Sequence, residues 1–113
     1  MNECIFCKIA AGQAAAKIVY RDELATVFWD IHPVAPLHLL LVPNRHLISL
    51  NEATAEDAAL LGHLVVLAAQ MAAQHGVAHS GYRLLTNTGK HGGQSVFHLH
   101  WHLLAGRQMR SLG

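Results

Sequence analysis

Three histidines that alternate with apolar residues constrain the fold of this chain more than any other feature. His98, His100 and His102 are each followed by a leucine or a tryptophan. Side chains at every second position of a β-strand share one face, so this spacing predicts a strand over residues 95–104 with three imidazoles on one side. A lone histidine on a strand is usually a tolerated surface or core residue. Three in strict alternation indicate a metal site, a nucleophile with helper groups, or both.

A glycine-rich run, His91-Gly-Gly-Gln94-Ser95, comes just before these histidines. Glycines at a junction between a loop and a strand allow backbone N–H groups to approach a ligand closely, and phosphate is the usual ligand of such loops. The two features together predict an anion-binding loop that leads into a strand carrying three imidazoles.

The rest of the chain contains short apolar runs and one long helical pattern. We expect strands at residues 17–21, 24–29, 37–42 and 82–87, a short helix within residues 1–11 and a long helix at residues 55–74. Thr54 and Asp57 would form a capping box at the start of the long helix, and Gly76 would end it. Strands on both sides of one long helix indicate an α+β fold with an antiparallel sheet.

Length and composition limit the possible classes of protein. The 113 residues suit one domain over residues 1–113, and a net charge of +1 gives no electrostatic basis for nucleic acid as a bulk ligand. There is no signal-peptide pattern, and no apolar run reaches the roughly 18 residues that span a bilayer. We therefore expect a cytoplasmic protein without a membrane partner. In that reducing compartment, the C-x-x-C spacing of Cys4 and Cys7 favours metal or redox chemistry.

The segment that begins at His98 fits the H-φ-H-φ-H-φ-φ signature of the histidine triad (HIT) superfamily, where φ is an apolar residue. Matching segments run along nearly the whole chain: Cys4 to Ile9, Phe28 to Ile31, Pro36 to His38, Pro43 to His46, Tyr82-Arg83, Asn87, and Gly92 to Val96. Residues 105–107, Ala-Gly-Arg, are similar to the Gly-Gly-Arg ending of the Hint-like branch. The sequence therefore resembles a Hint-like member of the HIT superfamily.

This resemblance implies a HIT-like fold, which has a five-stranded antiparallel sheet, one long helix and a short N-terminal helix. It also implies a homodimer that binds purine nucleotides. Relatives of this kind cleave the P–N bond of adenosine 5′-phosphoramidates, releasing AMP and an amine through a nucleotidyl-histidine intermediate. By matching positions, His100 would be the nucleophile, His102 would bind phosphate or leaving-group oxygens, Ser95 would donate toward the leaving amine, and His38 would be a proton relay.

The resemblance also implies which residues bind the nucleotide. Asp30 would accept hydrogen bonds from the ribose hydroxyls, a role that suits an acceptor-only carboxylate; as an alternative it is a turn residue before His32-Pro33. The base slot would be apolar, and the phosphate would be held by backbone N–H groups and side chains. The slot residues are Ile5, Phe6, Ile9, Phe28 and Ile31, and the phosphate residues are Asn87, Gly93, Gln94, Ser95, His100 and His102.

Cys4, Cys7, His46 and His98 form a Cys₂His₂ set of the kind that holds tetrahedral zinc. Their spacing is not that of a zinc finger, but the resemblance implies a structural zinc because some bacterial relatives bind zinc with this set. His98 would then serve the metal, leaving His100 and His102 for chemistry. As an alternative, the two thiols behave as small buried hydrophobes.

Three other functions remain open from the sequence. The same pocket would suit a non-catalytic AMP sensor or regulatory binding protein, or a hydrolase of dinucleoside polyphosphates. A metalloenzyme with zinc on His98, His100 and His102 is disfavoured, because the outer two positions of a straight strand lie about 13 Å apart. The amine, the base preference and the effect of the tail after Met109 are not set by these patterns.

Overall fold

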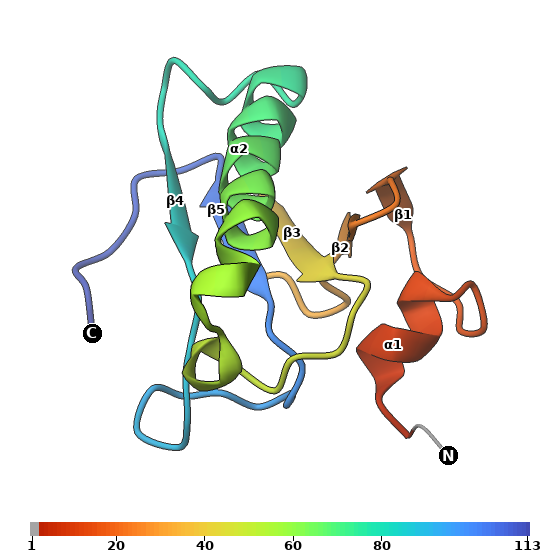
Figure 1. The fold of residues 1–113 in the computed structure, drawn as a ribbon. Helices are drawn as coiled ribbons and strands as arrows, with labels where there is room; N and C mark the ends of the chain where they lie inside the picture. Colours follow the sequence, from red (N-terminus) through yellow and green to blue (C-terminus); the bar gives the residue numbers. More distant parts are fainter. Residues whose placement is uncertain (1–2) are drawn as a thin grey trace.

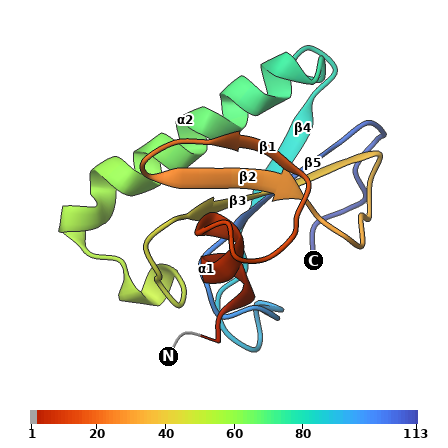
Figure 2. The ribbon, with the colours of Figure 1, turned by 90° about the vertical axis from the view of Figure 1, so that its right-hand side faces the viewer.

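The computed structural model describes residues 3–113, so Met1 and Asn2, where the predicted N-terminal segment starts, lie outside the described residues. Five antiparallel strands form one sheet in the order β1-β2-β3-β5-β4. Their bounds are β1 Ile18–Arg21, β2 Ala25–Trp29, β3 Leu37–Pro43, β4 Tyr82–Leu85 and β5 Trp101–Ala105. Helix α2 (Ala58–Gln74) covers one face and α1 (Ile5–Ala10) the other (Figures 1 and 2). The predicted α+β fold with one long and one short helix is confirmed.

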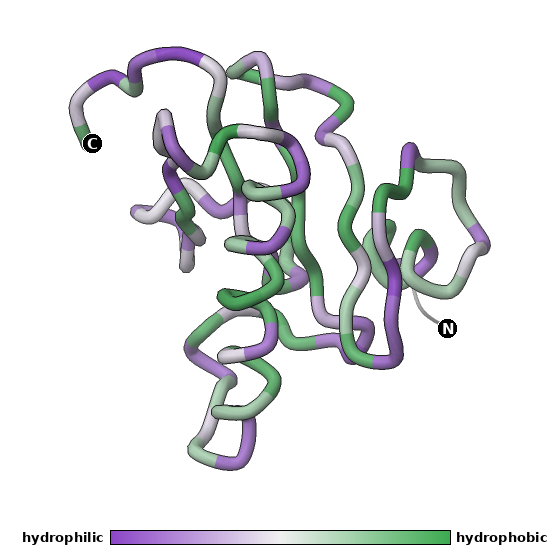
Figure 3. Tube along the Cα trace, turned by 90° about the horizontal axis from the view of Figure 1, so that it is seen from above, coloured by the Kyte–Doolittle hydropathy of each residue, from purple (hydrophilic) through white to green (hydrophobic). Residues whose placement is uncertain are grey.

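β3 is the central strand of the sheet, and all seven of its residues are buried. Leu39 and Leu41 point into the core beneath α2, whereas Leu40 and Val42 point into a second core beneath α1. A strand covered on both faces does not need polar alternation, which explains its nearly unbroken apolar sequence. In Figure 3 the apolar segments run through the middle of the sheet, and α2 alternates between apolar and polar residues.

Helix α2 follows the predicted 3.6-residue periodicity. It buries one stripe of side chains against the sheet: Leu64, Leu67, Ala68, Met71 and Ala72. The predicted capping box forms, but it starts a one-turn 3₁₀ helix, Ala55–Asp57, that runs directly into α2. Gly76, with a φ of 75°, lies immediately after the C-cap residue His75, as expected of a helix-ending glycine.

The helical stretch Ala55–Gln74 has a mean hydropathy of 1.2 and is long enough to cross a membrane by length and composition alone. This differs from the expectation, drawn from the sequence, that no apolar run is long enough to span a bilayer. Core helices meet the same criterion, and the buried stripe of α2 packs on the sheet. The packing accounts for the buried stripe, whereas only 33% of the apolar window is buried and Val65 and Val66 are exposed.

The strand predicted over residues 95–104 is shorter in the structure, because β5 begins only at Trp101. The pairing of β3 with β5 ends at Leu41 and Trp101. Beyond that point Pro43 has no N–H to donate, and its carbonyl accepts a hydrogen bond from the side chain of His98 at 2.8 Å. Of the three histidines, His102 therefore lies in β5, whereas His98 and His100 lie in the irregular segment before it, which bends at His98.

Candidate active site and metal cluster

The three histidines divide between two neighbouring sites instead of sharing one. His98 is fully buried and faces two thiols, while His100 and His102 line an open pocket with their ring centroids 5.0 Å apart. Phe6 separates the two sites, since its ring makes edge contacts with both His98 and His100. The prediction that all three imidazoles project together is therefore wrong in detail, because β5 begins only at Trp101 and the backbone bends at His98, so the alternation does not extend to His98.

The pocket has a volume of about 370 Å³ and lies between α1, the end of β2 and the segment that leads into β5. One part of its lining is apolar and the other carries titratable and hydroxyl groups. The apolar residues are Ile5, Phe6, Ile9, Ala15, Ala16, Phe28, Trp29, Ile31, Leu40 and Val96, and the polar ones are Asp30, His32, Ser95, His100 and His102. Such a division suits a ligand with a flat apolar ring and a charged end.

His100 is oriented by the backbone. Its Nδ1 donates a hydrogen bond to the carbonyl oxygen of His98 at 2.7 Å, so in the neutral ring Nε2 keeps its lone pair. Burial lowers the pKa of His100 below 6.5, although the hydrogen bond to His98 and the charge of Asp30 act in the opposite direction. At neutral pH the ring is therefore uncharged, with its second nitrogen available as a nucleophile.

In His102 the ring hydrogen is on Nε2 and not on Nδ1 as in His100, and a single backbone N–H determines this position. The N–H of Val34 donates to Nδ1 of His38 at 3.1 Å, so Nε2 of His38 carries the hydrogen and donates to Nδ1 of His102 at 2.9 Å. Nε2 of His102 then carries a hydrogen of its own. Burial, followed by the nearby His100 and His38, lowers the pKa of His102 to about 4. The pocket thus has a lone pair on His100 beside an N–H donor on His102.

Asp30 fulfils the turn role considered from the sequence and is also available to a ligand. Its Oδ1 accepts a hydrogen bond from the backbone N–H of His32 at 2.7 Å, and its Oδ2 lies 3.4 Å from Nε2 of His38. Asp30, His38 and His102 are close enough to hold a cation. A metal on Nε2 of His38 would require the hydrogen to move to Nδ1, where it would oppose the N–H of Val34. This cluster is therefore better described as a chain of hydrogen-bonded side chains than as a metal site.

The glycine-rich loop has its predicted position, but the side chains of Asn87 and Gln94 form hydrogen bonds to backbone groups of the loop and its neighbours. A Cβ on Gly92 would lie 2.3 Å from the carbonyl oxygen of Thr88, and Gly93 has a φ of 82°. The amide of Asn87 donates to the Gly92 carbonyl at 2.6 Å. The buried Gln94 accepts from the Gly89 N–H at 2.9 Å and donates to the carbonyls of Ile48 and Val96.

Among the residues predicted to hold phosphate, Ser95, His100 and His102 line the pocket, whereas Asn87, Gly93 and Gln94 do not. The side chains of Asn87 and Gln94 are already bonded to the backbone of the loop and its neighbours. Their contribution is to fix the shape of the loop. All five residues predicted for the base slot line the pocket, with Ile31 exposed at its rim.

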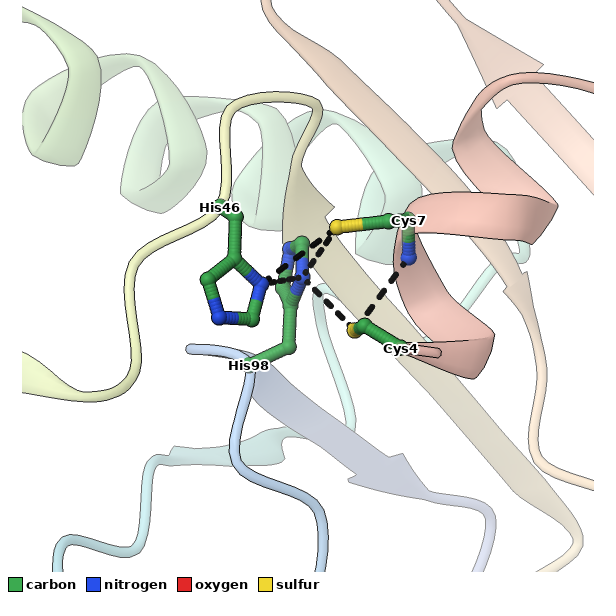
Figure 4. Close-up of side chains that lie close together, drawn as sticks. All are labelled: Cys4, Cys7, His46 and His98. Atoms are coloured by element: carbon green, nitrogen blue, oxygen red, sulfur yellow. Dashed lines mark hydrogen bonds between the residues drawn. The ribbon is translucent and has the colours of Figure 1, made fainter. Parts of the chain in front are cut away.

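Cys4, Cys7, His46 and His98 converge beside α1, and their four donor atoms lie within 4.8 Å of one another (Figure 4). Nδ1 of His98 is 3.3 Å from Sγ of Cys4, 3.4 Å from Sγ of Cys7 and 3.1 Å from Nδ1 of His46. Ligands at ordinary zinc distances are separated by roughly 3.3–3.8 Å in a tetrahedron. Because Nε2 of His98 donates to Pro43, its Nδ1 lone pair points at the cluster. The donor set and its geometry fit Zn²⁺.

Sequence reasoning missed several residues of the pocket. Ala15, Ala16, Trp29 and His32 line it but carry no distinctive pattern, and the role of Val34 depends on its backbone N–H alone. No side-chain signal could have revealed that contact. The flanking Pro33 and Pro36, which exclude regular structure, were the nearest available hint.

Comparison with known proteins places this fold and sequence among the histidine-triad hydrolases. The chain belongs to the HIT domain family, whose family model matches residues 11–109. It is 47% identical over 108 residues to the purine nucleoside phosphoramidase of Escherichia coli K12, covering 96% of this chain and 91% of the relative.

Solved structures show the same fold. A HIT family hydrolase from Legionella pneumophila superposes with a TM-score of 0.94 at 42% identity, covering 96% of each chain. A Zn-bound histidine triad family protein from Mycobacterium smegmatis superposes with a TM-score of 0.80 at 32% identity, covering 98% of this chain and 80% of that one.

Proposed function

We propose that this protein hydrolyses the P–N bond of purine nucleoside 5′-phosphoramidates, releasing a nucleoside monophosphate and an amine. The observation that carries the proposal is the paired arrangement of His100 and His102, a lone pair beside an N–H donor in one pocket. Phosphoramidate cleavage uses both: a nucleophile for phosphorus and a hydrogen-bond donor for the group from which the amine departs. The similarity to a purine nucleoside phosphoramidase supports the same reaction.

The pocket orients such a substrate from its apolar end. The purine would lie between Phe6 and Ile9 of α1 and Phe28 of β2, with Ile31 at the rim. Asp30, whose carboxylate only accepts hydrogen bonds, would receive those of the ribose hydroxyls. The α-phosphate would then face the histidines, with the hydroxyl of Ser95 as a further donor.

In the first step, Nε2 of His100 attacks phosphorus, forming a P–N bond to the enzyme while the bond to the substrate amine breaks. The leaving nitrogen takes up a proton from solvent, so the amine departs neutral, while Nε2–H of His102 stays in place as a hydrogen-bond donor to the reacting group. In the second step, water attacks phosphorus and the bond to His100 breaks. The proton of the attacking water passes to solvent, and His100 returns to its starting state. The hydroxyl of Ser95, the residue of the glycine-rich loop that lines the pocket, would support the charge that develops on the phosphoryl oxygens.

Zinc bound by Cys4, Cys7, His46 and His98 would supply a structural cross-link and no chemical step. It would join α1, which walls the base slot, to the segment whose carbonyl orients His100. We further propose a cytoplasmic homodimer of this single domain. The open edge of β4 and the exposed Val65 and Val66 of α2 are suited to a second copy of the chain.

The deciding experiment compares the wild type with His100→Ala for turnover of an adenosine 5′-phosphoramidate and, in parallel, for AMP binding by calorimetry. We expect wild-type turnover that falls by at least about 10³-fold in the variant, with AMP binding retained. AMP binding without turnover in either protein would favour a nucleotide sensor. Preferential cleavage of a dinucleoside polyphosphate would favour that class of hydrolase. Equal turnover in both proteins would remove His100 from the mechanism.

A further inference from the structure

The two thiols occupy positions from which they can react with each other. Cys4 is the N-cap residue of α1 and Cys7 lies in its first turn, with the Cys7 N–H donating to Sγ of Cys4 at 3.4 Å. The two sulfurs lie within 4.8 Å of each other. Residues three apart at the start of a helix have Cα atoms roughly 5–6 Å apart, which is within the range that a disulfide spans. Both side chains are only partly buried, so a small oxidant can reach them.

The helix that carries the thiols also forms one wall of the nucleoside pocket. Phe6 and Ile9, on the same six-residue helix, pack with Phe28 in the core beneath α1 and line the pocket. The ring of Phe6 lies 5.0 Å from that of His100 and 5.9 Å from that of His98. Since α1 is so short, a change in the direction of its first turn moves the base slot as well.

We propose that Cys4 and Cys7 are a reversible disulfide site whose closure releases the metal and weakens nucleotide binding in the adjacent pocket. The oxidant is a low-molecular-weight disulfide such as glutathione disulfide. One thiol attacks it, releasing one reduced glutathione; the second thiol attacks the mixed disulfide, releasing the other. The two sulfurs give up two electrons to glutathione. The two protons come from the thiols or, when the metal is bound and the sulfurs are thiolates, from solvent. Zn²⁺ leaves because two of its four ligands are lost.

The geometry determines the direction of the effect. A disulfide brings the sulfurs to about 2.05 Å from each other, so they must turn away from Nδ1 of His98 and His46, which they now face at 3.3–3.4 Å. The start of α1 then loses its connection to His98. The C-terminal end of α1 stays anchored, because Arg21 donates to the carbonyl of Ile9 at 3.1 Å. Closure therefore tilts α1 at the end nearest the metal cluster.

The test equilibrates zinc-loaded wild-type protein with mixtures of oxidised and reduced glutathione over a wide range of ratios. Three quantities are measured at each ratio: intact mass, zinc released to a coloured chelator, and the dissociation constant for AMP. We expect a mass loss of two hydrogens, one zinc released per disulfide, and a dissociation constant about 5- to 20-fold higher. Dithiothreitol and zinc should restore all three. Because the inference rests on nucleotide binding in the proposed pocket, AMP binding by the reduced protein tests that premise separately.

Cys4→Asp is the matched control, since aspartate is both a zinc ligand and a good N-cap residue but cannot form a disulfide. Its zinc should remain bound at glutathione ratios that empty the wild type. The inference is overturned if no disulfide forms at any ratio, if the disulfide forms with zinc retained, or if AMP affinity is the same in the two redox states. Each of these outcomes is read from the wild type even if the variant folds poorly.

Discussion

At the scale of single residues, the site depends on hydrogen positions that backbone groups impose on the histidines. The carbonyl of His98 holds the hydrogen on Nδ1 of His100, and the N–H of Val34 acts through His38 to place one on Nε2 of His102. The sequence predicts the three side chains but neither tautomer. Tautomers depend on which backbone groups lie nearby, and the chain segments that supply them are irregular.

Replacing His38 tests this relay. His38→Ala removes the donor to Nδ1 of His102, so His102 can place its hydrogen on either nitrogen and is no longer held as a donor toward the leaving group. We expect kcat for phosphoramidate hydrolysis to fall by about 10²-fold, with the dissociation constant for AMP changing by less than about threefold. Steady-state kinetics and calorimetry measure the two. The exposed His79, changed to alanine, is the control. An unchanged kcat in His38→Ala would exclude the relay.

The acid limb of the pH profile follows from the pKa of His100. The reaction needs this imidazole neutral, and burial holds its pKa below 6.5. The neutral form therefore persists as pH falls through 6.5 and is lost only below that value. We expect kcat/KM to be level between pH 8 and about pH 6.5 and to decline at lower pH. A midpoint at or above pH 7 for the acid limb would contradict a buried, uncharged nucleophile.

At the scale of elements, regular patterns were predictable and irregular junctions were not. The helix periodicity, the capping box and four strands followed from the spacing of apolar residues, with boundaries within about two residues. The strand over residues 95–104 was too long, because alternation continues through His98 although Pro43 ends the ladder opposite it. Only the resemblance grouped the four donor residues that converge beside α1 and the five apolar residues that line the pocket, since each group comes from distant segments.

The loop before β5 gives a matched pair of glycine substitutions. Gly92→Ala would place a Cβ 2.3 Å from the Thr88 carbonyl oxygen, so the loop must open. We expect kcat/KM to fall by about 10- to 100-fold and the melting temperature to decrease. Gly62 lies on the exposed face of α2, and a Cβ at this position would have no atom within 4 Å. Gly62→Ala should therefore stabilise the protein by about 0.5–1 kcal/mol. Calorimetry and turnover of both variants check this; comparable effects at the two positions would contradict it.

At the scale of the whole molecule, one carboxylate links the β1–β2 hairpin to α2. Asp22 accepts hydrogen bonds from the Tyr20 hydroxyl and the His63 ring, and from the N–H groups of Leu24 and Ala25. Burial by itself would raise its pKa, but these hydrogen bonds together lower it to about 2. The sequence suggested only a turn at this position, since partners on α2 are distant in the chain.

The stability that Asp22 contributes has a definite pH range. Its folded pKa lies below the ordinary 3.8, so the contribution is complete above pH 3.8 and is lost as pH falls through about 2. We expect Asp22→Asn to lower the free energy of unfolding by about 1–2 kcal/mol at pH 7 and to have little effect near pH 2. Urea unfolding at both pH values measures this. Glu23→Gln, at an exposed neighbour, is the control, and an equal loss at both pH values would contradict a charge-dependent role.

The proposed dimer can be tested on the surface that α2 leaves uncovered. Val65 and Val66 are 43% and 58% exposed on a helix whose opposite stripe is buried, and adjacent apolar side chains of this kind favour contact with another copy. Light scattering should give wild-type protein twice the chain mass of 12.3 kDa. Val66→Glu should shift the mass toward one chain, because a carboxylate in that contact would lose its hydration. Val34→Glu, 62% exposed on the loop after β2, should leave the mass unchanged. If the wild-type protein has the mass of one chain, the dimer is excluded. If the Val66→Glu variant still has the mass of two chains, the dimer contact does not include this face of α2.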